Sequence, residues 1–221
     1  MTIIDKLGNF SLFSLLSKSS QDLVNEHALW KSYQAKEHLI EKGDSVAGVF
    51  LIQSGSLRVY TINSKGHETT LYWVNSGNSC VLAMNCIFSN LFYPAWVESC
   101  EEEVEIAIIP PAIYRKLFET EPLIQEFTFN VQSATVFDLL TTLEEAVTSS
   151  FMQRLASLLI KKADNRKIVN LGHDEIANHL GTAREVVSRA CRQMQNKGLI
   201  STKRKEITLL DTTALSKLTL E

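Results

Sequence analysis

The sequence predicts an α+β fold with an N-terminal β-roll, a long helix and a C-terminal winged helix-turn-helix. Three observations indicate this order. Short apolar strands separated by turn residues fill 36–109, a helical apolar periodicity begins at Pro122, and a helix-turn-helix pattern followed by two short strands comes last. We therefore expect a sensor domain at 1–121, a dimerisation helix at 122–149 and a DNA-binding domain at 150–221.

The 221 residues have an ordinary globular composition, 45% hydrophobic and 21% charged. The start of the chain lacks the basic and apolar regions of a signal peptide, and no apolar run is long enough to span a membrane. We therefore expect a cytoplasmic protein without membrane contact. No P-loop, GxSxG or HExxH pattern is present, so the sequence does not predict an enzyme.

The net charge of −3 conceals a division between the two ends of the chain. Residues 1–150 carry 9 Lys and Arg against 18 Asp and Glu, whereas residues 151–221 carry 13 against 7. A basic C-terminal part on an acidic body is typical of a protein in which one domain alone contacts phosphates.

The β-roll is predicted from regularly spaced turns. Gly43, Gly55, Gly66 and Gly77 stand 12, 11 and 11 residues apart, each within a short run of turn residues such as Ser64-Lys65-Gly66. Each interval holds one strand of an antiparallel roll or barrel together with its turn. A short helix is expected before the roll, at 19–30.

Two helices are expected after the roll, at 112–118 and from Pro122, which suits the first position of a helix. The apolar stripe of the second helix comprises Ile124, Phe127, Val131, Ala134, Phe137, Leu140, Leu143 and Val147. Such a stripe faces either the core of its own domain or a partner helix. The length of this helix, placed between two domains, favours the partner helix and hence a homodimer.

The segment 173–192 has the pattern of a helix-turn-helix. The residues expected to pack its two helices together are Ile176, Ala177 and Leu180 on the first and Val186, Val187 and Ala190 on the second. Gly181 supplies the turn, and Thr182 with Glu185 forms a capping-box pattern that predicts where the second helix begins. His173 and His179, at the ends of the first helix, are interpreted as surface or phosphate-contacting residues.

Polar side chains recur on one face near the start of the second helix, where a recognition helix meets DNA bases. After Gly198 the chain reads as strand, basic turn and strand, which is the wing of a winged helix. The predicted DNA-binding residues are Thr182, Arg184, Glu185, Ser188, Arg189, Lys203, Arg204 and Lys205. The alternative, two stacked helices with a merely solvated face, explains the basic charge less well.

At these residues the sequence resembles the CRP/FNR superfamily of bacterial transcription regulators. HLIEKGDSVAGVFLIQSGSLRVY (38–60) is similar to the family's cyclic-nucleotide-binding fold, and Arg184 to Arg189 is similar to its recognition helix. The resemblance implies a homodimer that binds double-stranded DNA at palindromic, TTGA-like half-sites, with RNA polymerase as a further partner. It assigns base contacts to Glu185, Ser188 and Arg189, and arginine is independently suited to pair with guanine.

The sensor part departs from the family's cyclic-AMP binders. Their Gly-Glu pair and their Arg-Ser or Arg-Thr pair are missing from the corresponding segments, 79–86 and 93–96. The cyclic phosphate would lose its charged partner and the ribose hydroxyl its acceptor. We therefore expect an effector other than cyclic AMP.

Three cysteines suggest what replaces the nucleotide. Cys80 and Cys86 lie in the altered segment, and Cys100 is expected on a later strand that could lie nearby. They are either small packing residues or a thiol sensor of oxidants, reactive sulfur or a soft metal. Haem is a further alternative. No CxxC pair predicts a metal site, no cofactor is required, and Cys191 is interpreted as packing.

The competing function is a cyclic-nucleotide-type regulatory module that acts on a partner other than DNA. The β-roll alone would fit that function. The basic helix-turn-helix disfavours it, because such a module would not need a surface for phosphates.

Overall fold

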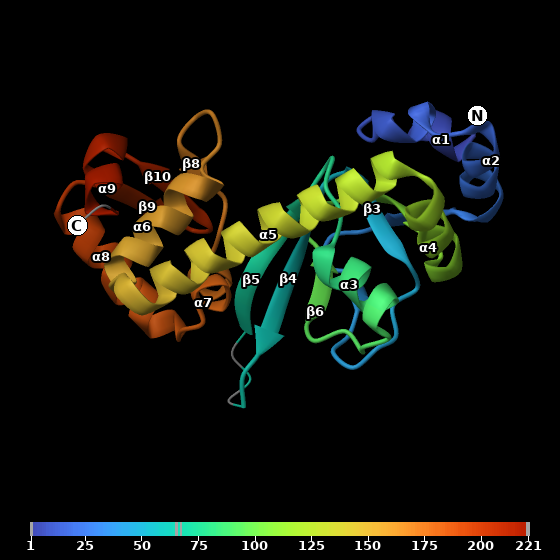
Figure 1. Ribbon diagram of the computed structural model, residues 1–221. Coiled ribbons are helices and arrows are strands. Elements are labelled where there is room, and N and C mark those ends of the chain that lie inside the picture. Colours follow the sequence, from blue (N-terminus) through green and yellow to red (C-terminus); the bar gives the residue numbers. More distant parts are fainter. Residues whose placement is uncertain (1, 65, 67, 220–221) are drawn as a thin grey trace. The chain divides into compact units, whose positions relative to one another are not determined.

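The computed structural model describes residues 2–64, 66 and 68–219 (Figure 1). The chain divides into two compact units, Met1–Tyr60 with Leu71–Leu139, and Thr61–Thr70 with Leu140–Glu221. Within the described part of the chain, no helix is both long enough and apolar enough to cross a membrane.

Short helices precede the first strand. They are α1 (Ile3–Lys6), the 3₁₀ helix η1 (Ser11–Leu15) and α2 (Lys18–His27). The helix expected to reach Trp30 ends at His27, because Leu29 and Trp30 already pair with β7. The roll therefore begins earlier than predicted from the sequence.

Two antiparallel sheets form the predicted β-roll. The strands are β1 (Leu29–Tyr33), β2 (His38–Ile40), β3 (Val49–Ser54), β4 (Ser56–Ile62), β5 (Glu68–Asn75), β6 (Trp96–Ser99) and β7 (Val104–Ile109). One sheet has the order β1-β7-β3 and the other β2-β6-β4-β5. Buried side chains from both sheets, among them Ile52, Val59 and Ile106, form a common core.

The predicted turn glycines all adopt the left-handed conformation. The φ angles of Gly43, Gly55, Gly66 and Gly77 are 97°, 75°, 79° and 81°, a region that residues with a Cβ atom rarely enter. A Cβ atom at Gly55 would also press against Val104. Lys65, part of one predicted turn, lies outside the described residues.

Helix α3 (Val81–Ser89) stands between β5 and β6 and carries Cys86. The helix expected at 112–118 is the longer α4 (Pro111–Thr120). Helix α5 (Pro122–Thr148) begins at the predicted proline.

The apolar stripe of α5 is divided between two environments. Ile124, Phe127 and Val131 pack into the core of their own unit. The large apolar side chains that are exposed on the described part of α5 are Leu123 near its start and, further along, Phe129, Val136, Phe137, Leu140, Leu143 and Val147. The first half of the predicted stripe therefore faces the core of its own unit, and the partner helix that we favoured for the whole stripe is wrong there.

The remaining elements are α6 (Phe151–Lys162), β8 (Ile168–Val169), α7 (His173–Leu180), α8 (Arg184–Asn196), β9 (Ile200–Lys203), β10 (Glu206–Leu209) and α9 (Thr212–Leu218). β10 lies between β8 and β9 in an antiparallel sheet. Helix α6 packs against α9 and begins with a capping box in which Ser150 and Gln153 bond reciprocally.

Candidate DNA interface and sensor segment

Gly181 forms the turn between α7 and α8, as predicted. Thr182 does not have its predicted role as the cap of α8. Gly181 has φ 65°, and the backbone N–H of Thr182 donates to the Ala177 carbonyl at 3.0 Å. The residue that caps α8 is Ala183, with no side-chain cap bond, so the predicted capping box is wrong. Thr182 stands one residue too early because its backbone closes α7. Glu185 is therefore exposed on the second helical position.

The buried face of α8 fixes how this helix lies against α7. Val187, Ala190, Cys191 and Met194 are buried, opposite Ile176 and Ala177 of α7. Val186, expected to pack here, is 38% exposed. Cys191 is a packing residue, as predicted, and burial raises the pKa of its thiol to about 11.

The opposite face of α8 is polar and concave. Arg184, Glu185, Ser188, Arg189 and Arg192 line a depression of about 280 Å³. Residues three or four positions apart, such as Arg184 and Ser188 or Glu185 and Arg189, are neighbours on the surface of a helix. Arg192 is absent from the sequence-based set, although its position four residues after Ser188 signals it.

Helix α7 contacts this polar face with its first two residues. The Nδ1 of His173 lies 2.9 Å from the Oγ of the partly buried Ser188. Next to it, Asp174 forms an ion pair with Arg184 at 3.4 Å, in which both side chains are more than half exposed. Such an exposed ion pair contributes little to stability. The contact of His173 with Ser188 is instead partly shielded from water.

The predicted wing is present. Strands β9 and β10 pair in register from Glu206 with Lys203 to Leu209 with Ile200, and Arg204 and Lys205 form the turn. The side chain of Lys203 is 76% exposed and forms an ion pair with Glu206 at 3.5 Å. The wing therefore presents three exposed basic residues to solvent.

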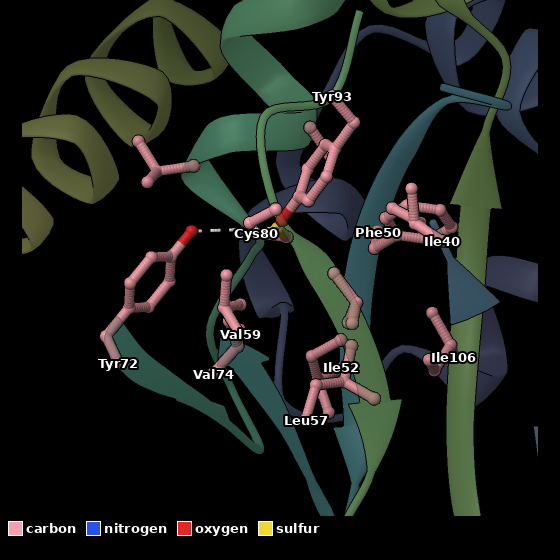
Figure 2. Close-up of a cluster of buried hydrophobic side chains, with 14 of the residues drawn as sticks. Ile40, Phe50, Ile52, Leu57, Val59, Tyr72, Val74, Cys80, Tyr93 and Ile106 are labelled. Carbon is pink, nitrogen blue, oxygen red and sulfur yellow. Dashed lines mark hydrogen bonds between the residues drawn. The ribbon is translucent and has the colours of Figure 1, made fainter. Parts of the chain in front are cut away.

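In the other unit, Cys80 lies at the residue that precedes α3 and is fully buried. Its Sγ is 3.1 Å from the Tyr93 hydroxyl and 3.9 Å from the Tyr72 hydroxyl (Figure 2). Burial raises the pKa of the Cys80 thiol, an effect that hydrogen bonds from Tyr93 and neighbouring groups reduce. The thiol and the two phenols belong to the same buried cluster as Phe50 and Ile40.

The other two candidate cysteines lie in different surroundings. Cys86, on α3, is 8% exposed, and its pKa is raised by burial and then by the nearby Cys80. Cys100 is exposed and follows β6 in a loop, where its backbone N–H donates to the Ser56 carbonyl at 3.0 Å. The expectation that Cys100 lies on a strand is wrong.

Helix α3 is bonded to both helices that follow the roll. The Nε of Arg115, on α4, donates to the Ile87 carbonyl at 2.8 Å. The side-chain amide of Gln132, on α5, donates to Asn85 Oδ1 at 3.0 Å. Both contacts attach to the C-terminal half of α3, at Ile87 and Asn85, whereas Cys80 lies at its start. Within the described residues, no group of three or more His, Cys, Asp or Glu side chains is arranged to hold a metal ion.

A β-roll joined to a winged helix-turn-helix defines a DNA-binding transcription regulator with an effector-binding domain. Residues 30–121 match the model of the cyclic nucleotide-binding domain, and residues 153–218 match that of the Crp-like helix-turn-helix domain. The chain belongs to the CRP/FNR family of transcription regulators, whose members are not enzymes.

Relatives match over most of the chain. A transcriptional regulator of the CRP/FNR family from Eubacterium rectale has a crystal structure with a TM-score of 0.87 and 26% identity, covering 96% of this chain and 99% of that one. The transcriptional activator protein FnrA of Stutzerimonas stutzeri is 25% identical, over 82% of this chain and 77% of its own length. The cAMP-activated regulator CRP of Salmonella typhimurium is 23% identical, over 84% and 91%.

Proposed function

We propose that this chain is a homodimeric regulator that binds palindromic DNA with TTGA-like half-sites and responds to a thiol-directed signal other than cyclic AMP. It acts in the cytoplasm, where its DNA target and RNA polymerase are found. The observation that carries the DNA-binding part of the proposal is the exposed polar face of α8, at the level of Glu185, Ser188 and Arg189.

Each polar residue has a role suited to its chemistry. Arg189 donates two hydrogen bonds to guanine O6 and N7, and Glu185 accepts from a cytosine amino group. The side chain of Glu185 is exposed near the start of α8, which supports this role. Thr182, Arg184 and the wing residues Lys203, Arg204 and Lys205 contact phosphates and orient the helix.

The dimer forms through the exposed apolar residues of α5. Phe129, Val136, Leu140, Leu143 and Val147 are exposed and follow one another at intervals of seven, four, three and four residues, which suits a two-stranded coiled coil. Dimerisation is typical of the family. A two-fold axis along α5 relates two recognition helices, which then enter major grooves about one helical turn apart.

The sensing element is the segment that contains Cys80 and Cys86. Cys80 and Tyr93 belong to the two segments that correspond to the nucleotide-binding segments of cyclic-AMP-binding relatives, and both side chains are buried, which supports an effector of different chemistry. Cys86 reaches the surface and Cys80 does not, so the reagent first meets Cys86. Cys100 is a third participant only if its loop moves toward them. Haem is the remaining alternative, with a cysteine or histidine as axial ligand.

Oxidation would change the shape of α3. Two thiols form a disulfide by giving two electrons to the oxidant, a peroxide or a polysulfide, and releasing two protons. Six residues of helix rise about 9 Å, whereas the two Cα atoms of a disulfide lie within about 7 Å. The first turns of α3 must therefore unwind. The contacts of Arg115 with Ile87 and Gln132 with Asn85 would carry this movement to α4 and α5.

In vitro selection from random DNA tests the proposal. The expected product is a palindrome of two TTGA-like half-sites, bound with an affinity that falls steeply as salt rises. Selection of a single, non-palindromic site would contradict the dimeric arrangement. Binding that is independent of sequence and salt would instead favour a regulatory module for a partner other than DNA. An absorbance spectrum of the protein purified without oxygen separates the thiol sensor from haem.

A further inference from the structure

We infer that His173 is a positioning residue for base recognition: its ring nitrogen, 2.9 Å from Ser188 Oγ, fixes the direction in which that hydroxyl faces DNA. The inference rests on the proposed role of Ser188. His173 is the first residue of α7, whereas Ser188 lies in the middle of the polar face of α8. One helix of the motif thus controls a reading group on the other.

A serine hydroxyl without such a partner is a poor reader of bases. It has one proton and two acceptor sites, rotates easily, and on a helix can turn back to the carbonyl four residues earlier. For Ser188 that carbonyl belongs to Arg184. A bond to His173 removes this freedom, because the ring is held at the start of α7. The backbone there is anchored by Glu175, whose Oε2 accepts from the Gly172 N–H at 2.8 Å.

The bond also divides the hydrogen-bonding roles of the hydroxyl. When Nδ1 accepts the serine proton, Oγ can only accept from the DNA, which selects an amino group of adenine or cytosine. When Nδ1 carries a proton, Oγ accepts from the ring and offers its own proton to guanine or to thymine O4. His173 therefore sets which base edge Ser188 recognises, without contacting the base itself.

The neighbouring contact provides a matched control. Asp174 holds Arg184 through an exposed ion pair at 3.4 Å, on the same turn of α7. Exposed pairs contribute little. Replacing Asp174 thus changes the same turn of the helix without touching Ser188.

The experiment compares the affinity of the full-length protein for its own selected site with its affinity for single-base variants. Ser188→Ala identifies the base pair that Ser188 reads. His173→Leu should lower discrimination at that same base pair by about fivefold, as expected for one net hydrogen bond. His173→Asn, which places an amide near the position of Nδ1, should restore most of it, and Asp174→Ala should leave it unchanged. Thermal unfolding confirms that each variant is folded.

Three outcomes overturn the inference. If His173→Leu weakens binding to all sequences alike, the histidine contacts phosphate and does not position Ser188. If the losses of discrimination in His173→Leu and Ser188→Ala add in the double variant, the two residues act independently. If Ser188→Ala itself leaves discrimination unchanged, the proposed role of Ser188 fails, and that of His173 with it. Only the first two results leave the proposed function intact.

Discussion

The guanidinium of Arg58 lies 2.8 Å from the carboxylate of Glu98, and the two side chains are only 6% and 18% exposed. The residues face each other in register on β4 and β6. The Arg58 guanidinium also lies 4.5 Å from the centre of the Tyr60 ring. This buried pair lies in the sheet β2-β6-β4-β5.

Removing one charge of this pair should destabilise the roll. Glu98→Gln leaves the guanidinium buried without its carboxylate, at a cost of about 3 kcal/mol in the free energy of unfolding. Urea unfolding followed by circular dichroism measures this. The double variant Arg58→Met, Glu98→Leu should recover much of the loss. An unchanged urea midpoint in Glu98→Gln would contradict this, because it would mean that water or other groups stabilise the charge of Arg58.

Leu140→Glu should separate the dimer. Leu140 is 55% exposed in the isolated chain, so the protomer should fold normally. In a dimer, the two added carboxylates would meet at the seam, at a cost on the order of several kcal/mol. Light scattering at micromolar concentration should report a monomer, and affinity for the palindrome should fall by about 100-fold or more.

Thr142→Glu is the matched control, since Thr142 lies beside the α5 stripe and not on it. It should remain dimeric. A monomeric wild-type protein at micromolar concentration would contradict the whole arrangement.

Replacing Arg189 and replacing Lys203 should weaken DNA binding in different ways. Arg189→Ala should cost about 1–3 kcal/mol on the selected site and relax the preference for one guanine. Lys203→Ala should weaken all sequences alike and flatten the dependence of affinity on salt by about one unit. Titrations at several salt concentrations with matched and mismatched DNA separate the two effects. Unchanged preference in Arg189→Ala would remove Arg189 from the set of base readers.

Local patterns in the sequence were sufficient for the fold class, the four turn glycines, the start of α5 and the wing. Each depends on residues close together in the chain, such as Gly181 or Pro122. The predictions were wrong where contacts between segments far apart in the sequence determine the structure. Leu29 and Trp30 became a strand because β7 pairs with them, and Val131 was covered by the roll.

The contact of His173 with Ser188 also could not be predicted from the sequence, because it depends on how α7 and α8 cross. Helix α6 was missed although Ser150 and Gln153 signal its start.

Serine at Cys80 or Cys86 should abolish the effect of a thiol oxidant on DNA affinity while leaving basal binding unchanged. In the wild type, oxidation should produce one internal disulfide, visible by mass spectrometry, and a loss of helical signal from α3. Cys191→Ser is the control, because that thiol is buried in the other unit and should not react. A normal response of the double variant Cys80→Ser, Cys86→Ser would leave these cysteines as packing residues.

The free energy of unfolding should fall above about pH 9 because the thiol of Cys191 is buried. In the folded protein the pKa of Cys191 is about 11, against 9.0 for an exposed thiol. Between these values the unfolded chain has lost a proton that the folded chain keeps, so rising pH favours unfolding. Cys191→Ala should reduce the loss between pH 9 and 11 by on the order of 2 kcal/mol. Identical pH slopes in urea unfolding of the two proteins would contradict this.

The packing of Tyr72, Tyr93 and Cys80 also determines the time course of the proposed thiol response. Because Cys80 has no exposed surface, a reagent reaches it only during a transient opening of the roll. At high reagent concentration, Cys80 should react each time the roll opens. The reaction rate at Cys80 should then equal the opening rate and stop rising with reagent concentration. The proposed sensor would then respond to the duration of a signal, because a brief pulse ends before many molecules have opened.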